Sequence, residues 1–325
     1  MPAFKFTKVN PGDVLTIDYD LSSIGEFAKI KEAILSAGIT GTWSSDYKKF
    51  TVNTISGNST IDLIVNKYGI DIDFSSLSLN DTFFLGKYQV ASETPWDIEW
   101  EIVHQESDYQ IAMAKQIIDL RCFDAMEPSN SDANRKNSGN NNWGVSNIEQ
   151  WLNSDQSNWY SAQHSADAPP SSANVSTNPY DTKPGFLYYW TDKEKAVLQD
   201  MTLTLANNTV TDGGGSYTWT GKVWLPTYTQ MSGDQNNNIS EGTKFSKFTD
   251  DNSRIKTLHA MCAANNQYCI NKSMTEGTAH YYWQSSAYPS YSDRSRAVNS
   301  GGAPTTASYA NFGHLGLAPC IRVPR

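Results

Sequence analysis

From Leu79 to the C-terminus, short apolar segments alternate with long polar stretches in which uncharged Asn, Ser and Thr predominate. Two of the apolar segments, residues 83–90 and 98–103, have the length and composition of short strands. The polar stretches between the apolar segments include residues 168–183, 211–216 and 232–239. Loops of this length inside a compact domain are usually functional or stabilised by their own packing. The alternation predicts an α+β domain of short strands and long loops.

The first 75 residues follow a different pattern. Residues 14–19 read as an extended segment, and residues 40–43, 50–52 and 60–65 as strands. One amphipathic helix is predicted from apolar residues at helical spacing before Gly38, namely Ile24, Phe27, Ile30, Ile34 and Leu35. A chain of 325 residues suits one small and one large domain. We therefore predict a small α+β domain over residues 1–75 that mounts a larger domain over residues 76–325.

Two short helices are predicted in the larger domain from capping boxes. In this motif a Ser or Thr side chain caps the first turn, and a Glu three residues later reaches back to the backbone of the cap. Ser146 and Glu149 form one such pair, and Thr191 and Glu194 form the other. Trp143 follows the asparagine-rich residues 137–142, which predicts an ordered loop pinned by an aromatic side chain.

Charge and cysteine content exclude several classes of protein. A net charge of -9 and a pI of about 5.0 argue against a nucleic-acid binder, which needs clustered Lys and Arg. No basic segment with an apolar core follows Met1, and no apolar run reaches about 18 residues, so neither an export signal nor membrane insertion is expected. Four cysteines without CxxC spacing read as ordinary buried thiols.

Several motifs, in order, resemble a domain family common in phages and prophages of Gram-positive gut bacteria. They are Leu85-Gly86-Lys87-Tyr88, Ile98-Glu99-Trp100-Glu101, Ile118-Asp119-Leu120-Arg121, Asn142-Trp143, Gln150-Trp151-Leu152-Asn153, Gln163-His164-Ser165-Ala166, Gly185-Phe186-Leu187, Thr211-Asp212-Gly213 and Tyr282-Trp283. The resemblance covers residues 79–325. It implies a C-type-lectin-like fold, distantly similar to phage variable display proteins and formylglycine-generating enzymes. The closing segment departs from the family, because extra residues separate Gly316 from Arg322.

A segment near the C-terminus has the composition of a binding surface. Tyr supplies rigid contact area at low entropic cost, while Asn and Arg supply hydrogen bonds, and a sugar can stack its apolar face on an aromatic ring. The alternative is that some of these side chains fill the core. The predicted ligand-binding residues are Tyr288, Tyr291, Arg294, Arg296, Asn299, Tyr309, Asn311 and Phe312.

Metal binding and catalysis were weighed against this interpretation. Calcium is a possible cofactor, because polar loops offer the oxygen ligands Asp181, Asp212, Asp234, Asp250 and Asp251, yet no spacing matches an EF-hand. The five histidines lack zinc-ligand spacing.

A catalytic role would need Cys320 to pair with Cys262 or Cys269, or Glu99 and Glu101 to act as paired acids. Nothing in the spacing requires either arrangement. We expect a protein that is not an enzyme and has no catalytic residues.

These features lead to two hypotheses. In the first, the chain is a virion surface protein of a bacteriophage, anchored to other virion proteins by residues 1–75, whose lectin-like domain binds a host-surface glycan or protein. In the second, it is a structural decoration or accessory protein of the phage head or tail. A homo-oligomer is expected because particle proteins commonly assemble with symmetry, although the absence of heptads argues against a coiled-coil stalk.

Overall fold

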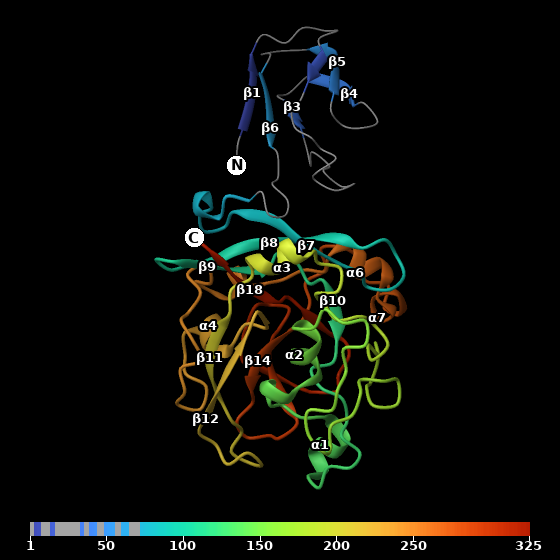
Figure 1. Cartoon of the computed structure of the whole chain (residues 1–325), viewed down its shortest axis with the longest axis vertical. Coiled ribbons are helices and arrows are strands. Elements are labelled where there is room, and N and C mark those ends of the chain that lie inside the picture. The colour runs from blue at the N-terminus through green and yellow to red at the C-terminus, as the bar shows by residue number, and fades with distance from the viewer. Residues whose placement is uncertain are drawn as a thin grey trace. The chain divides into compact units, whose positions relative to one another are not determined.

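The structure, a computed structural model, describes residues 72–325 and, before them, the backbone of six strands. The chain divides into two compact units. The first unit comprises Met1–Leu77 together with Phe83–Leu85, and the second comprises Ser78–Thr82 together with Gly86–Arg325. More of the described residues lie in strands than in helices, so the predicted α+β class is confirmed (Figure 1).

The N-terminal unit contains two antiparallel three-stranded sheets. One has the order β1 (Ala3–Thr7), β6 (Thr60–Ile64), β3 (Ala33–Leu35). The other has the order β2 (Val14–Thr16), β5 (Lys49–Ile55), β4 (Ile39–Trp43). These bounds confirm the strands expected at residues 40–43 and 50–52. Strand β2 covers residues 14–16 of the extended segment expected at 14–19, and β6 covers residues 60–64 of the strand expected at 60–65. Residues 17–19 and 65 lie outside the described residues.

The predicted helix over residues 24–35 is wrong at its C-terminal end. Ile34 and Leu35 lie in strand β3 and pair with Asp62 and Ile61 of β6. Apolar spacing reports only local preference, and pairing with a distant strand can override it. Residues 24–32 of the predicted helix lie outside the described residues.

The strands from β7 onward form two five-stranded sheets and a hairpin. The first sheet has the order β13 (Val223–Trp224), β18 (Cys320–Pro324), β9 (Tyr109–Ala114), β8 (Trp96–Gln105), β7 (Thr82–Tyr88). The second has the order β10 (Asp119–Arg121), β17 (Leu315–Leu317), β14 (Tyr282–Ala287), β15 (Arg294–Val298), β16 (Thr306–Tyr309). The hairpin pairs β11 (Met201–Ala206) with β12 (Ser216–Gly221).

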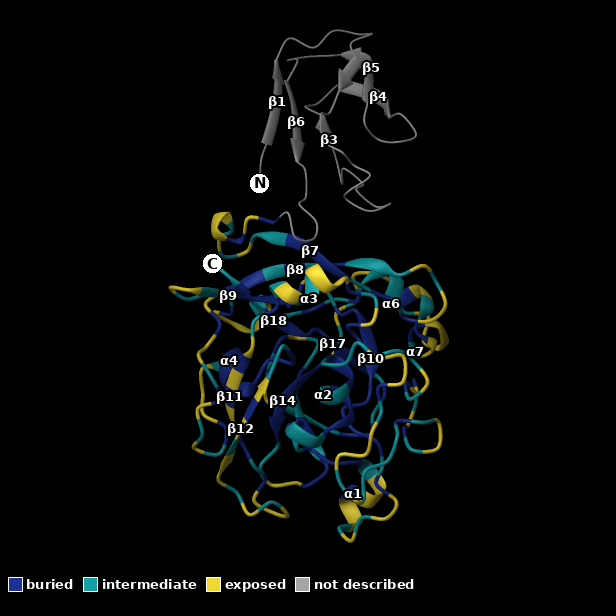
Figure 2. Cartoon of the chain, viewed as in Figure 1, coloured by how far each residue is buried: buried dark blue, intermediate teal, exposed yellow. Residues whose placement is uncertain are grey.

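The core of this unit is aromatic. Strand β14 is buried along its whole length, and with β17 it lies in the interior of the unit (Figure 2). The core holds five tryptophans that are each at most 1% exposed, namely Trp100, Trp143, Trp151, Trp224 and, on β14 itself, Trp283. Burial of such large rings is the main stabilising term for a unit with short helices. The burial of Trp143 confirms that an aromatic side chain pins the asparagine-rich loop.

The helices are all short. They are α1 (Ala133–Ser138), α2 (Asn147–Leu152), α3 (Asp192–Val197), α4 (Tyr228–Ser232), α5 (Asp251–Arg254), α6 (Ala260–Asn265) and α7 (Gln267–Asn271), with 3-10 helices η3 (Phe74–Ser76) and η4 (Trp143–Val145). Figure 1 shows α6 and α7 on one side of the unit and α4 with the β11–β12 hairpin on the other. Within the described range, no helix has the length and apolar character needed to cross a bilayer.

The two predicted capping boxes have different outcomes. The box at α3 is complete, because Thr191 and Glu194 each bind the other's backbone N–H. At α2, Ser146 Oγ accepts a hydrogen bond from Glu149 N, but the Glu149 carboxylate does not return to the cap. It accepts instead from Trp219 Nε1 at 3.0 Å and Asn153 Nδ2 at 3.2 Å. A tertiary contact has replaced half of the local motif.

Candidate ligand-binding surface

A continuous row of rings and guanidinium groups lies on the second unit, and we call it the aromatic row. Its members are Tyr228, Arg296, Tyr288, Tyr291, Arg294, Tyr309, Phe312 and His314. The Arg296 guanidinium carbon lies 3.9 Å from the ring centroid of Tyr228 and 5.0 Å from that of Tyr288. The Arg294 carbon lies 4.1 Å from the Tyr291 centroid and 4.4 Å from the Tyr309 centroid. Each guanidinium therefore contacts two tyrosines.

Ring-to-ring contacts connect and extend these two clusters. The centroids of Tyr288 and Tyr291 lie 5.6 Å apart, which joins the Arg296 cluster to the Arg294 cluster. At the other end, the Tyr309 and Phe312 centroids lie 5.2 Å apart, and those of Phe312 and His314 lie 4.9 Å apart. These separations fall in the range of favourable aromatic pairs. The contacts hold the row in one arrangement before any ligand arrives.

Strand geometry explains why residues 294–309 meet. Arg294 and Arg296 are two residues apart on β15, so both side chains point to the same side of the strand. Tyr309 of β16 lies directly opposite Arg294 in the antiparallel register. Because β16 ends the sheet order, the row lies beside a sheet edge.

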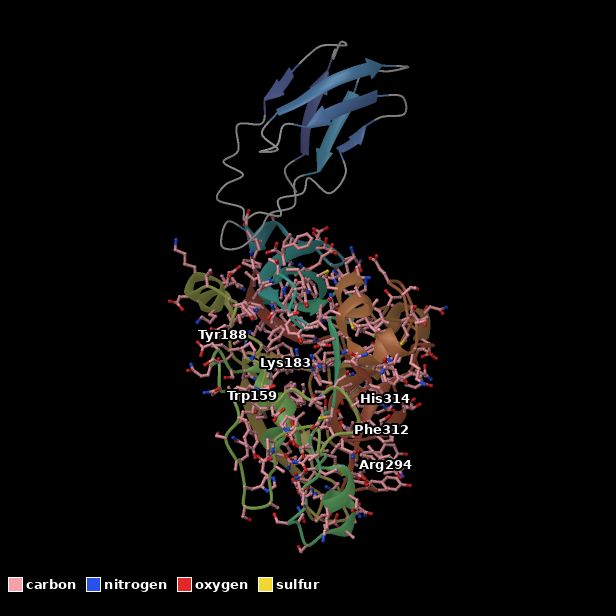
Figure 3. The ribbon with its side chains drawn as sticks, turned by 90° about the vertical axis from the view of Figure 1, so that its right-hand side faces the viewer. Trp159, Lys183, Tyr188, Arg294, Phe312 and His314 are labelled. Atoms are coloured by element: carbon pink, nitrogen blue, oxygen red, sulfur yellow. The ribbon has the colours of Figure 1, made fainter. Side chains whose placement is uncertain are left out.

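Most of the aromatic row is half-buried. Tyr291 is 38% exposed, Tyr228 is buried, and the other members have intermediate exposure. Figure 3 shows Arg294, Phe312 and His314 one above another along one side of the unit. Half-buried rings are fixed by packing and still contact solvent, which is the state expected of a preformed binding surface.

The polar partners of the two arginines are few. Arg294 Nη2 donates to Tyr309 Oη at 2.8 Å, and Arg294 Nε is buried without a partner. Arg296 Nε donates to Asn236 Oδ1 at 2.9 Å. Two nearby carboxyl groups, Asp293 and Glu241, are buried, and burial raises the pKa of each.

Asn141 holds the segment that carries Tyr291 and Arg294. Its Nδ2 donates to the backbone carbonyls of Tyr291 at 2.7 Å and Arg294 at 2.9 Å. Its Oδ1 accepts from Asn208 Nδ2 at 3.0 Å. Asn141 and Asn208 are both fully buried. The asparagine-rich loop thus fixes the backbone of the aromatic row from the buried side.

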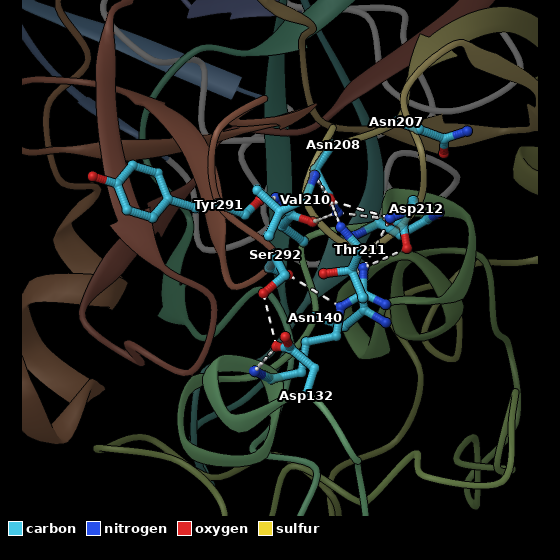
Figure 4. A network of polar contacts seen from close by, with 12 residues as sticks. Asp132, Asn140, Asn207, Asn208, Val210, Thr211, Asp212, Tyr291 and Ser292 are labelled. Carbon is cyan, nitrogen blue, oxygen red and sulfur yellow. Dashed lines mark hydrogen bonds and ion pairs between the residues drawn. The ribbon is translucent and has the colours of Figure 1, made fainter.

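An ion pair extends this support (Figure 4). Arg135 Nη2 donates to both carboxylate oxygens of Asp212, at 2.8 and 2.7 Å. Its Nε donates to the carbonyl of Ser292 at 3.2 Å. Ser292 Oγ in turn donates to Asp132 Oδ1 at 2.8 Å. The backbone between Tyr291 and Arg294 is therefore fixed from two directions.

The structure brings together six of the eight residues expected to bind a ligand, and the other two are asparagines with structural contacts. Asn299 Oδ1 accepts from the N–H groups of Gly301 and Ala303, which closes a turn. Asn311 is 9% exposed, and its Nδ2 donates to the Asn137 carbonyl. We therefore exclude both asparagines from the aromatic row.

Sequence reasoning missed His314, which ends the row, and also Tyr228 and Asn141. Tyr228 comes from α4, 60 positions before Tyr288, and Asn141 comes from the asparagine-rich loop. Only long-range packing brings them to the row, and no local pattern marks either position.

The aspartates considered for calcium have other partners or lie apart. Asp212 pairs with Arg135, Asp251 pairs with Arg254, and Asp250 caps α5 by accepting from Ser253 N. Asp234 Oδ2 lies 3.4 Å from Tyr228 Oη. Over residues 72–325 no group of three His, Cys, Asp or Glu side chains could hold a metal ion.

The residues considered for catalysis are also engaged in the fold. All four cysteines are free and buried, which confirms the prediction of buried thiols. Burial raises the pKa of Cys320, so its reactive thiolate is disfavoured. Glu99 pairs with Lys115 at 2.9 Å, and Glu101 pairs with Lys247 at 2.6 Å. Neither glutamate has the free, paired arrangement of a glycosidase acid.

Two hollows lie elsewhere on the second unit. One, of about 140 Å³, is lined by Trp151, Tyr88, Tyr189 and Lys183 among others. The other, of about 430 Å³, is lined by Glu101 and the lysines Lys115, Lys247 and Lys256 among others. Lys256 Nζ donates to the carbonyls of Ala114 and Lys115, and burial lowers its pKa to about 8. In the second hollow, the lysines mainly support the fold.

Residues 108–325 match the domain of unknown function DUF6273, and the chain belongs to that family. No curated protein and no solved structure matches the chain.

Proposed function

We propose that the chain is a surface protein of a bacteriophage particle and binds a host-surface glycan or protein through the aromatic row. The observation that carries this proposal is the pair of guanidinium groups, Arg294 and Arg296, each held against two tyrosine rings at a half-exposed surface. Enrichment in Tyr and Arg with buried polar support is typical of binding surfaces.

The support beneath the row strengthens this interpretation. A surface that only fills space does not need three buried asparagine and arginine side chains to fix one backbone segment, yet Asn141, Asn208 and Arg135 all contribute to fixing residues 291–294. Preorganisation of this kind lowers the entropic cost of binding. A merely structural surface would gain little from it.

We also propose a C-type-lectin-like fold for the second unit. Two features support this proposal. The C-terminal strand β18 pairs antiparallel with β9, which brings distant parts of the unit together, and long loops separate the strands between them. The proposed attachment of the chain to other virion proteins through residues 1–75 rests on the division of the chain into a small and a large unit, because the motif resemblance covers only residues 79–325.

The proposal can be tested with the full-length chain on an array of bacterial-surface glycans and by pull-down from host-cell envelopes. We expect saturable binding by the wild type and its loss in the triple variant Tyr288→Ala, Tyr291→Ala, Arg294→Ala. Tyr188→Ala is the matched control, because Tyr188 is also exposed, at 46%, but lies outside the row.

Immunogold labelling of phage particles tests the location. Labelling of the particle surface is expected. A folded wild-type chain that binds nothing in either assay, while it labels particles, would favour a structural decoration of the head or tail instead.

A further inference from the structure

We propose that the ligand of the aromatic row is an anionic glycan whose carboxylate or phosphate oxygens bind the guanidinium of Arg294. This inference rests on the proposed function and adds the chemical class of the ligand.

The charge pairing of Arg294 and Arg296 differs from that of four other arginines in the second unit. Arg121, Arg135, Arg254 and Arg322 each have a carboxylate oxygen within 4 Å. Arg294 and Arg296 have no such partner among the described residues, although the chain carries 34 acidic and 25 basic residues. An excess of acids makes an unpaired arginine unusual, and two of them lie side by side here.

The Arg294 guanidinium also has open donors. A guanidinium offers five N–H donors, and only the hydrogen bond to Tyr309 Oη uses one of them within the part of the chain that the structure describes. Nε is buried and has no partner, so the donors open to a ligand are those of Nη1 and Nη2. Two oxygens on one carbon or phosphorus atom match the fork of a guanidinium.

Because tyrosine rings stack on the Arg294 guanidinium, a ligand can bind it only at its N–H edge. The rings of Tyr291 and Tyr309 both lie within 4.4 Å of the Arg294 guanidinium carbon. Rings at these positions limit approach to the faces of the plane, so an anion reaches Arg294 through its N–H groups. The tyrosine rings then border the bound group and offer surfaces for a neighbouring sugar.

Each arginine of the row has an acid near it. Glu241 acts on Arg296 electrostatically, and the exposed Asp234 lies beside Tyr228 at the same end of the row. Asp293 is buried beside Arg294 and interacts with it electrostatically. The Arg296 end therefore has two acids and the Arg294 end has one, and Arg296 Nε already donates to Asn236 Oδ1. We therefore place the anion at Arg294.

The test uses the full-length chain on an array that pairs uronic-acid glycans and hexose-phosphate glycans with their neutral counterparts. We expect acidic glycans to bind at least about tenfold more tightly than neutral ones, and this preference to weaken as salt is raised from low to high concentration. The uronic-acid and phosphate arms distinguish the two sources of anionic oxygens.

Three variants place the effect at Arg294. Arg294→Gln should bind acidic glycans no better than neutral ones, whereas Arg294→Lys should keep part of the preference because it keeps the charge but loses the fork. Arg322→Gln is the matched control, since Arg322 also stacks on a tyrosine, 3.9 Å from the Tyr109 centroid, but outside the row. Melting temperatures confirm folding of each variant.

Each outcome has one meaning. Acidic preference that Arg294→Gln removes supports the inference. Equal binding of neutral and acidic glycans, lost in the triple variant, overturns the inference and leaves the proposed function standing. Acidic preference that survives Arg294→Gln also overturns it. No binding to any glycan or envelope protein overturns both.

Discussion

Two arginines, Arg121 and Arg294, are both in contact with tyrosines, yet they occupy opposite environments. Arg121 is 3% exposed, and its Nη2 lies 2.5 Å from Asp119 Oδ2 and 3.2 Å from the Val90 carbonyl. Tyr88 and Asn266 also donate to Asp119. Arg294 is half-exposed, has no carboxylate oxygen within 4 Å, and donates one hydrogen bond through its guanidinium.

This difference separates an arginine that stabilises the fold from one that remains available to bind a ligand. The Arg121 charge is neutralised within the core, so the protein itself uses the interaction. The Arg294 charge is oriented by packing but left unneutralised. A charge held in place without a partner is suited to bind something outside the chain.

The largest expected effect is on folding. Arg121→Met should lower the free energy of unfolding by about 3–5 kcal/mol, because it leaves the Asp119 carboxylate buried and unpaired. Arg294→Gln should lower it by less than about 1 kcal/mol, the scale of an exposed cation–π contact. Urea unfolding followed by tryptophan fluorescence measures both. Equal losses of unfolding free energy in Arg121→Met and Arg294→Gln would contradict the conclusion that Arg121 stabilises the fold and Arg294 does not.

A second prediction concerns the support beneath the row. Asn141→Ala removes the donor to the carbonyls of Tyr291 and Arg294, so the free energy of unfolding should fall by about 2–3 kcal/mol, and glycan binding should weaken as the backbone moves. Asn142→Ala is the neighbouring control. It removes only the cap of η4 and should cost about 1 kcal/mol without changing binding. Full binding by a folded Asn141→Ala variant would remove the positioning role.

The third prediction concerns pH. Burial raises the pKa of Glu149 to about 7, above its usual value of 4.5. Between these two values the folded protein holds a proton that the unfolded chain has lost, so this group's contribution to stability falls as pH rises from 4.5 to 7. We expect a contribution of about 3 kcal/mol. The difference in unfolding free energy between wild type and Glu149→Gln should vary over this pH range, whereas a constant difference would contradict the assignment.

The smallest effect is expected at Asn299. Asn299→Ala removes a turn-closing acceptor and should cost less than about 1 kcal/mol in the free energy of unfolding. Glycan binding should not change, because Asn299 lies outside the aromatic row. If Asn299→Ala weakened glycan binding as much as Arg294→Gln does, Asn299 would also contact the ligand, and the binding surface would extend beyond the aromatic row.

Sequence reasoning located features that depend on neighbours along the chain. The capping box of α3 and strands β4, β5, β7 and β8 follow from local chemistry. Residues 288–312 meet because one strand pair and its flanking loops carry them. The α+β class also followed from the short apolar segments.

Features that depend on distant contacts were not predictable. Ile34 and Leu35 have helical spacing but pair with β6, and Glu149 leaves its capping position for Trp219. Tyr228 reaches the row from α4. The closing segment is also not one strand, since Gly316 lies in β17 and Arg322 in β18, in different sheets. In each case partners far away in sequence decide the outcome.

The most direct test of the aromatic row is a crystal structure of the full-length chain soaked with the acidic glycan that binds best on the array. The account predicts ligand density against Tyr291 and Tyr309, with anionic oxygens in hydrogen-bond contact with the Arg294 guanidinium. Density in the hollow beside Trp151 and Lys183, with the aromatic row unoccupied, would contradict it.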